Sequence, residues 1–192
     1  MDDSAFDTEK KSSRQYDPGE GLIHFYTGFG KGKTTSAIGQ AVRFAGSGGR
    51  VLFTQFMKDG TSSEIAALKM IPNMEVFSMT EKLGFTFRMS EEERQEAFEK
   101  NMAYLREIRK RIEKGDYGML VLDEAAEAVR KDVLDDKALY DLLINKPKKL
   151  EVVVTGHVGV RSVMETADYI TVALKMRHPY DDGVPARKGV EY

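Results

Sequence analysis

The sequence contains no cysteine and no tryptophan, and only three of its 192 residues are histidine. Without cysteine, disulfide bonds, thiolate catalysis and cysteine-bound zinc are excluded. His24, His157 and His178 are scattered along the chain and show no metal-ligand spacing. Any metal ion that this protein binds is therefore expected to have oxygen ligands.

Long apolar runs and a strong excess of one charge are also missing. The apolar runs 119–122 and 152–154 fall far short of the roughly 20 residues that span a bilayer. The acidic beginning of the chain lacks the basic and apolar parts of a secretion signal. The formal net charge is -2, so no excess positive field attracts the phosphates of nucleic acid. We expect a cytoplasmic protein whose partners include neither membranes nor nucleic acids.

The chain length favours one domain, because two independent domains would each have a small core. Residues 1–20 are polar and end in the turn-forming sequence Asp17-Pro18-Gly19-Glu20, which predicts a flexible N-terminal leader. The alternative is an arm that becomes ordered on a ligand or partner, with Phe6 and Tyr16 as anchors. Residues 21–192 are expected to form the single folded domain.

Short apolar runs alternate with longer helical stretches from residue 22 onward. The expected strands are 22–26, 51–56, 75–77, 119–122, 151–155 and 169–172. The expected helices are 33–45, 63–70, 91–114, 137–144 and 160–166. This alternation predicts an α/β fold with a doubly wound, mostly parallel sheet.

The helix expected at 91–114 has the clearest sequence signals. Ser90 and Glu93 have capping-box spacing, and Gly115 follows the last helical residue. An apolar stripe runs along this helix at Phe98, Met102, Leu105, Ile108 and Ile112. We expect the stripe to pack in the core.

A glycine-rich segment joins the first expected strand to the first expected helix. It reads Thr27-Gly28-Phe29-Gly30-Lys31-Gly32-Lys33-Thr34-Thr35. The phosphate-loop pattern G-x-x-x-x-G-K-[ST] matches it, except that Thr27 stands at the first glycine position. The three glycines let backbone N–H groups turn toward phosphate oxygens, while Lys33 adds charge and the Thr34 hydroxyl is placed to bind Mg²⁺. The segment predicts a site for the triphosphate of ATP, and a glycine-rich turn without a ligand is the alternative.

The apolar run 119–122 ends in Asp123 and Glu124. These acids are expected at the carboxyl end of a strand, where ligands of open parallel sheets bind. With Thr34 they supply the oxygen atoms that Mg²⁺ or Mn²⁺ needs to bridge phosphates. Acids in this position also cap helices, so the pair indicates a metal site only in combination with the phosphate loop.

With these motifs, the sequence resembles the P-loop ATP:corrinoid adenosyltransferases over roughly residues 21–192. The glycine-rich segment matches that family, including its start without glycine. Further matches are Gln55-Phe56-Met57-Lys58, Gly84-Phe85-Thr86-Phe87, Leu122-Asp123-Glu124, Thr155-Gly156, Ala167-Asp168 and the ending from His178-Pro179-Tyr180 through Gly183 to 186–192. The ending is the most family-specific of these pieces.

The resemblance implies a RecA-like P-loop fold and a defined reaction. Co(I) of a reduced corrinoid attacks C5′ of ATP, and triphosphate leaves, in the biosynthesis or salvage of adenosylcobalamin. It implies catalytic roles for Lys33, Thr34 and Glu124, with Thr34, Asp123 and Glu124 at the metal. ATP would contact residues 27–35, Arg187 and Glu191, and the corrinoid would lie on Phe85 and Phe87. The resemblance also implies a homodimer and suggests a flavoprotein as electron donor.

Several residues depart from the family pattern, including Ala125-Ala126-Glu127, which follow Asp123-Glu124 where the family more often has apolar and aromatic residues. Phe29, Phe87, His157 and Val172 stand where the family often has Asn, Trp, Arg and Glu. His157 is expected to be a surface or loop residue, with contact to phosphate as the alternative, and Phe85 and Phe87 also fit a half-buried strand. Two other functions stay open: a regulatory protein that binds ATP and corrinoid without turnover, and a P-loop ATPase or kinase of another class.

Overall fold

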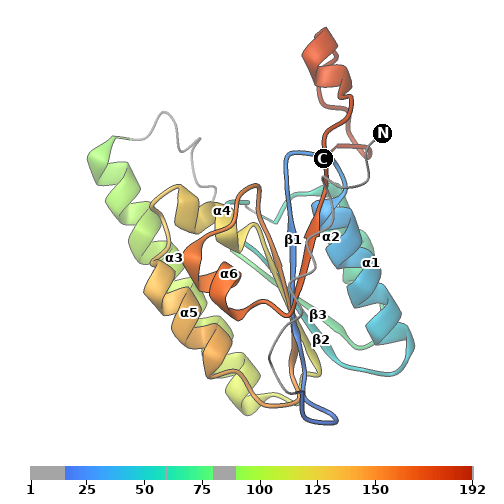
Figure 1. Cartoon of the computed structure of the whole chain (residues 1–192), viewed down its shortest axis with the longest axis vertical. Coiled ribbons are helices and arrows are strands. Elements are labelled where there is room, and N and C mark those ends of the chain that lie inside the picture. Colours follow the sequence, from blue (N-terminus) through green and yellow to red (C-terminus); the bar gives the residue numbers. More distant parts are fainter. Residues whose placement is uncertain (1–15, 59, 80–89, 192) are drawn as a thin grey trace.

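The computed structural model describes residues 16–58, 60–79 and 90–191, which form a parallel sheet with helices on both faces (Figure 1). The strands are β1 (Ile23–Thr27), β2 (Val51–Gln55), β3 (Met74–Ser78), β4 (Met119–Asp123), β5 (Glu151–Thr155) and β6 (Tyr169–Val172). Their order in the sheet is β3-β2-β4-β5-β1-β6, and every pair is parallel. The predicted α/β fold with a doubly wound parallel sheet is confirmed.

The helices are α1 (Lys33–Gly46), α2 (Ser63–Leu68), α3 (Glu91–Lys114), α4 (Ala125–Arg130), α5 (Asp136–Ile144) and α6 (Arg161–Thr166), followed by the 3₁₀ helix η3 (Pro179–Asp182). All the expected strands and helices are present, and their ends differ from the expected ones by no more than two residues. The sequence reasoning missed α4 and η3. α4 is short and follows β4 directly, so the sequence has neither a loop nor a side-chain cap to mark its start. The leader up to residue 15 and the segment with Phe85 and Phe87 lie outside the described residues.

Strand residues alternate between two cores, as a sheet covered on both faces requires. Phe53 and Val121 pack against α1 and α2, whereas Leu52 and Leu120 pack against the layer of α3, α4, α5 and α6. Each fully buried side chain of this kind contributes roughly 1.5–3 kcal/mol relative to exposure. No helix in the described parts of the chain is long and apolar enough to cross a membrane.

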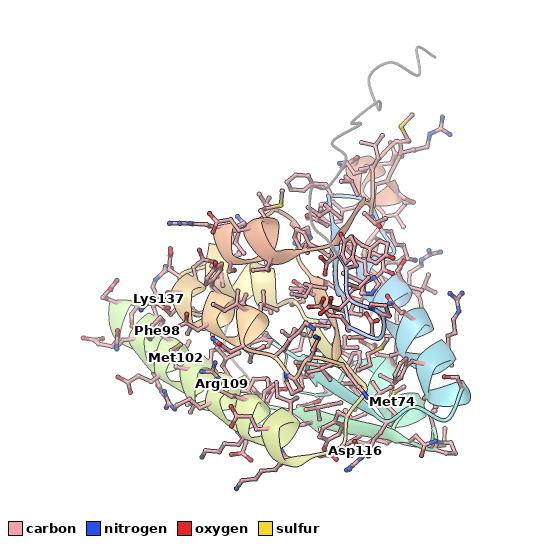
Figure 2. The ribbon with its side chains drawn as sticks, turned by 60° about the horizontal axis from the view of Figure 1, so that its bottom comes forward. Met74, Phe98, Met102, Arg109, Asp116 and Lys137 are labelled. Carbon is pink, nitrogen blue, oxygen red and sulfur yellow. The ribbon has the colours of Figure 1, made fainter. Side chains whose placement is uncertain are left out.

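The longest helix, α3, has the predicted start and the predicted buried face. The Ser90 side chain accepts a hydrogen bond from Glu93 N, and the Glu93 carboxylate accepts one from Ser90 N, which completes the capping box. Leu105, Ile108 and Ile112 are buried, as expected. Phe98 and Met102, which Figure 2 labels on the same helix, are only partly buried. The apolar stripe therefore enters the core mainly through the C-terminal half of α3.

The strand order brings four polar residues to one edge of the sheet. Thr27, Gln55, Asp123 and Thr155 each end a strand, and all four are buried. Their strands β2, β4, β5 and β1 are consecutive neighbours. The carboxyl ends of parallel strands meet at the same edge, so these residues converge between the phosphate loop and the acids.

Candidate functional site

The predicted phosphate loop connects β1 to α1, and its lysine is folded onto the loop. Lys33 is only 9% exposed, and its Nζ donates a hydrogen bond to the Gly30 carbonyl oxygen at 2.9 Å. Burial lowers the pKa of Lys33, while the charges of Glu124, Glu127 and Asp123 act in the opposite direction. The ammonium group is therefore partly desolvated, close to acids, and bonded to a carbonyl that a phosphate oxygen can replace.

Two of the loop glycines make room for the chain that follows β6. A Cβ atom on Gly28 would lie 2.4 Å from the carbonyl oxygen of Ala173, and one on Gly30 would lie 2.7 Å from it. Gly30 N donates to that oxygen at 2.7 Å, and Ala173 N donates to Thr27 O at 2.7 Å. Gly32, by contrast, has φ +115° and nothing within 4 Å of an added Cβ. The sequence predicted all three glycines for phosphate contact, but the first two also allow close packing of residue 173.

Asp123 connects the loop to the neighbouring strands. Its side chain is fully buried, and Oδ1 accepts hydrogen bonds from Thr34 Oγ1 at 2.9 Å and from Thr155 Oγ1 at 2.7 Å. Oδ2 accepts a hydrogen bond from Gln55 Nε2 at 3.0 Å, and Lys58 Nζ lies 3.6 Å away. Both carboxylate oxygens are thus occupied, and Thr34 is held with its hydroxyl hydrogen toward Asp123. The oxygen lone pairs of Thr34 stay available for a ligand.

Glu124 has a strained backbone and a carboxylate with no hydrogen bond to the described residues. Its φ is 61°, in the left-handed region that residues other than glycine rarely adopt. Glu124 N donates to Thr155 Oγ1 at 2.8 Å, which helps to hold this conformation. Burial and the adjacent charge of Asp123 raise the pKa of Glu124. Strained residues of this kind, costing about 1–3 kcal/mol, concentrate at functional sites.

The arrangement fits a magnesium ion that is bound together with phosphates. Thr34 and Glu124 offer uncommitted oxygen atoms, whereas Asp123 is placed to orient the Thr34 hydroxyl. The parts of the chain that the structure describes contain no group of three or more His, Cys, Asp or Glu side chains able to hold a metal ion. A cation here therefore needs oxygen atoms from a phosphate ligand, which is how Mg²⁺ is usually bound in nucleotide sites.

His157 is attached to the phosphate loop by its backbone and to α4 by its side chain. Its carbonyl oxygen accepts hydrogen bonds from Gly28 N and from Thr27 Oγ1, each at 3.1 Å. Its ring centroid lies 6.1 Å from that of Phe29, and its Nδ1 is 3.3 Å from Glu127 Oε2. The expected surface or loop histidine is thus a loop residue at the edge of the site. Sequence reasoning gave Glu127 no role, because no motif marks it.

Glu127 is expected to make the stability of the protein depend on pH in acid. Burial disfavours its charge, but hydrogen bonds from His157 and Arg130 outweigh burial and lower its pKa from 4.5 to about 2. Its contribution to stability is complete above about pH 4.5 and disappears as the pH falls toward 2. Urea unfolding across this range should show wild type losing about 2 kcal/mol more than Glu127→Gln. Equal losses in both proteins would contradict the assignment, and Glu113→Gln, on the surface of α3, is the control.

The C-terminal segment reaches the loop. Glu191 Oε1 is 3.2 Å from Lys31 Nζ and 2.9 Å from Arg187 Nη2. Residues 189–191 line a cavity of about 390 Å³ together with Thr34, Thr35 and Lys58. Hydrogen bonds from Arg187 lower the pKa of Glu191 to about 2. The structure therefore brings Glu191, which was predicted from the ending of the sequence, to Lys31 of the predicted phosphate loop, and Arg187 contacts Glu191.

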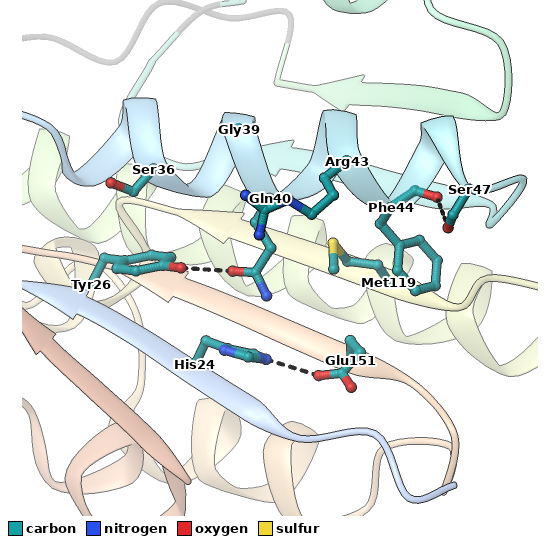
Figure 3. Close-up of a pocket in the computed structure, with 10 residues that line it drawn as sticks. All are labelled: His24, Tyr26, Ser36, Gly39, Gln40, Arg43, Phe44, Ser47, Met119 and Glu151. Atoms are coloured by element: carbon teal, nitrogen blue, oxygen red, sulfur yellow. Dashed lines mark hydrogen bonds and ion pairs between the residues drawn. The ribbon is translucent and has the colours of Figure 1, made fainter.

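A larger cavity, of about 850 Å³, lies beside α1 on the sheet face opposite α3 (Figure 3). Its lining includes the ion pair of His24 with Glu151, at 2.9 Å, and the hydrogen bond from Tyr26 Oη to Gln40 Oε1, at 2.8 Å. Neither Lys33 nor the acids of β4 line this cavity. It is thus separate from the predicted phosphate site.

Comparison with known proteins gives a consistent result across most of the chain. The model of the family described as ATP:corrinoid adenosyltransferase BtuR/CobO/CobP matches residues 19–192. A corrinoid adenosyltransferase of Pseudomonas aeruginosa is 31% identical over 174 residues, which are 90% of this chain and 84% of that protein. The corrinoid adenosyltransferase of Escherichia coli is 31% identical over 176 residues, covering 90% and 86%. The Salmonella typhimurium relative, corrinoid adenosyltransferase CobA, is 31% identical over 172 residues with the same coverage.

These matches agree with the resemblance seen in the motifs, and among the described motif residues Thr34, Asp123 and Thr155 meet at one edge of the sheet. Family membership rests on the matched length, which leaves out only the first 18 residues. The chain belongs to the ATP:corrinoid adenosyltransferase family.

Proposed function

We propose that this protein transfers the 5′-deoxyadenosyl group of ATP to Co(I) of a corrinoid. The cobalt electron pair forms a bond to C5′, the bond from C5′ to the triphosphate oxygen breaks, and triphosphate leaves with the electron pair of the broken bond. The observation that carries the proposal is the meeting of the phosphate loop with the acids of β4, at Thr34 and Asp123, in a member of this family. Such a reaction uses a metal-centred nucleophile, so the protein acts by positioning and by charge.

The roles of the residues follow from their places. Lys33 can exchange the Gly30 carbonyl for a phosphate oxygen, and its charge then stabilises the departing triphosphate. Mg²⁺, held by Thr34 and Glu124 and oriented through Asp123, would neutralise further negative charge on the phosphates. Residues 27–35, with Arg187 and Glu191, surround the triphosphate and close the site. Phe85 and Phe87 are assigned to the corrinoid from the resemblance alone.

The wider setting is also part of this proposal. We infer a homodimer, a flavoprotein as electron donor and a cytoplasmic location. The dimer is supported by β6, which is at the edge of the described sheet and exposes Tyr169, Ile170 and Val172. Exposed apolar edge strands commonly pair with another chain.

An anaerobic assay tests the function. The full-length protein is mixed with ATP, Mg²⁺ and chemically reduced cobalamin, the loss of the Co(I) spectrum is followed, and the phosphate product is identified. Adenosylcobalamin together with intact triphosphate is the expected result. Orthophosphate released without any corrinoid would indicate an ATPase, and binding without turnover would indicate a regulatory protein. A chelator control without Mg²⁺ should slow the transfer strongly.

A further inference from the structure

Strand order places His157 between the two halves of the site. β5 pairs with β1 on one side and with β4 on the other. A residue that follows β5 therefore emerges between the phosphate loop and the acids. The hydrogen bonds of the His157 carbonyl to Gly28 N and Thr27 Oγ1 fix the backbone there. This attachment does not depend on the identity of the side chain, so the imidazole is free to serve another purpose.

The imidazole is oriented by a chain of contacts from α4. Glu127, whose side chain is 7% exposed, contacts His157 Nδ1 and is itself held by Arg130, with Arg130 Nε 2.9 Å from Glu127 Oε2. A Cβ on Gly156 would lie 2.7 Å from Ala126 Cβ, so α4 is packed tightly against the turn that carries His157. This support fixes the ring and leaves Nε2 without a hydrogen bond among the described residues. A carboxylate behind one imidazole nitrogen commonly orients the other toward a ligand.

The ring also lies close to the charged groups of the site. The charge of His157 acts on the Glu124 carboxylate, and the charge of Glu127 acts on Lys33. The other charged groups that act on this part of the site are Glu127 and Arg130 from α4, Asp123 and Glu124 from the end of β4, Lys33 from the loop, and Lys58. The His157 side chain is 40% exposed, so a ligand in the loop can reach it from solvent.

We propose that His157 binds the triphosphate through Nε2 and that Glu127 positions it for this contact. The inference rests on the proposed function, because it deepens the account of how the leaving group is held. His157 is then a further side-chain donor to the phosphates, and Glu127 acts only through it.

Calorimetric binding of inorganic triphosphate with Mg²⁺ tests this without any corrinoid. His157→Gln should weaken binding about tenfold, because it removes one charge-assisted hydrogen bond. His157→Arg should restore binding, since arginine supplies a charged hydrogen-bond donor at the same position. Glu127→Gln should weaken binding less, and the double variant should bind no more weakly than His157→Gln alone. His24→Gln breaks another histidine–glutamate contact, at 2.9 Å in the separate cavity beside α1, and should bind as wild type does.

Several results would overturn the proposal. Triphosphate binding by His157→Gln that equals wild type removes His157 from the site, and failure of His157→Arg to restore binding removes the role of charge. Additive effects in the double variant would show that Glu127 acts independently. Steady-state assays of His157→Gln should show a KM for ATP above that of wild type and a KM for the corrinoid equal to that of wild type. If wild type binds triphosphate but transfers no adenosyl group, the proposed function fails while this test stands; if wild type binds no triphosphate, both fail.

Discussion

Lys33→Ala is expected to lower kcat/KM for ATP by about 100- to 1,000-fold, the range seen when one preorganised charge-stabilising group is removed. Lys33 Nζ is buried, bonded to the Gly30 carbonyl and surrounded by the charges of Glu124, Glu127 and Asp123. No other lysine of the loop combines burial with these acids, because Lys31 is exposed and paired with Glu191. The loss should appear both in triphosphate affinity and in the rate of adenosyl transfer.

The control for this substitution is Lys69→Ala, which removes an exposed lysine just after α2. Its activity should equal that of wild type. Urea unfolding of both variants separates a damaged fold from a damaged site. If Lys33→Ala kept wild-type activity with a wild-type fold, the assignment of residues 27–35 as the phosphate loop would be wrong. If Lys33→Arg restored activity, charge alone rather than the reach of the lysine would be decisive.

Much of the fold was predictable because local signals agree with the tertiary structure. The buried strands are short apolar runs, and β2 and β4 are buried at every position. α3 combines a capping box with an apolar stripe, so its ends were predicted to the residue. α4 was missed because its start depends on the left-handed conformation of Glu124, for which the sequence has no glycine or asparagine signal.

The site residues that could be predicted are those marked by a motif within one short segment of the sequence. Lys33 and Thr34 follow from the loop pattern, and Asp123 follows from the end of an apolar strand. Glu127 and Ala173 could not be found in this way, since their roles depend on the packing of α4 and on the course of the chain after β6. The family resemblance supplied Arg187 and Glu191, which lie more than 150 residues from Lys31 yet contact it or its partner.

Gly28→Ala is expected to be the most destabilising single substitution in the loop. The position has φ +101°, and the new Cβ would lie 2.4 Å from the backbone oxygen of Ala173. The left-handed conformation costs about 1–2 kcal/mol for alanine, and the collision adds about 1–3 kcal/mol as in an overpacked core. The collision is with backbone, so no side-chain rotation relieves it. The expected total is a loss of about 2–5 kcal/mol in the free energy of unfolding, measured by urea denaturation.

Two neighbouring glycines separate these causes. Gly32→Ala meets the conformational cost alone, because φ is +115° and nothing lies within 4 Å of the new Cβ. Gly30→Ala meets the collision alone, at 2.7 Å from Ala173 O, without a left-handed φ. Each should therefore be less destabilising than Gly28→Ala. If Gly28→Ala instead lost no more free energy of unfolding than Gly32→Ala, the close contact between residue 28 and Ala173 would not contribute to stability. The chain after β6 would then not be packed tightly against the phosphate loop. If the order holds, adding Mg²⁺ and triphosphate should stabilise wild type more than Gly28→Ala, because displacing residue 173 also displaces the loop that binds the phosphates.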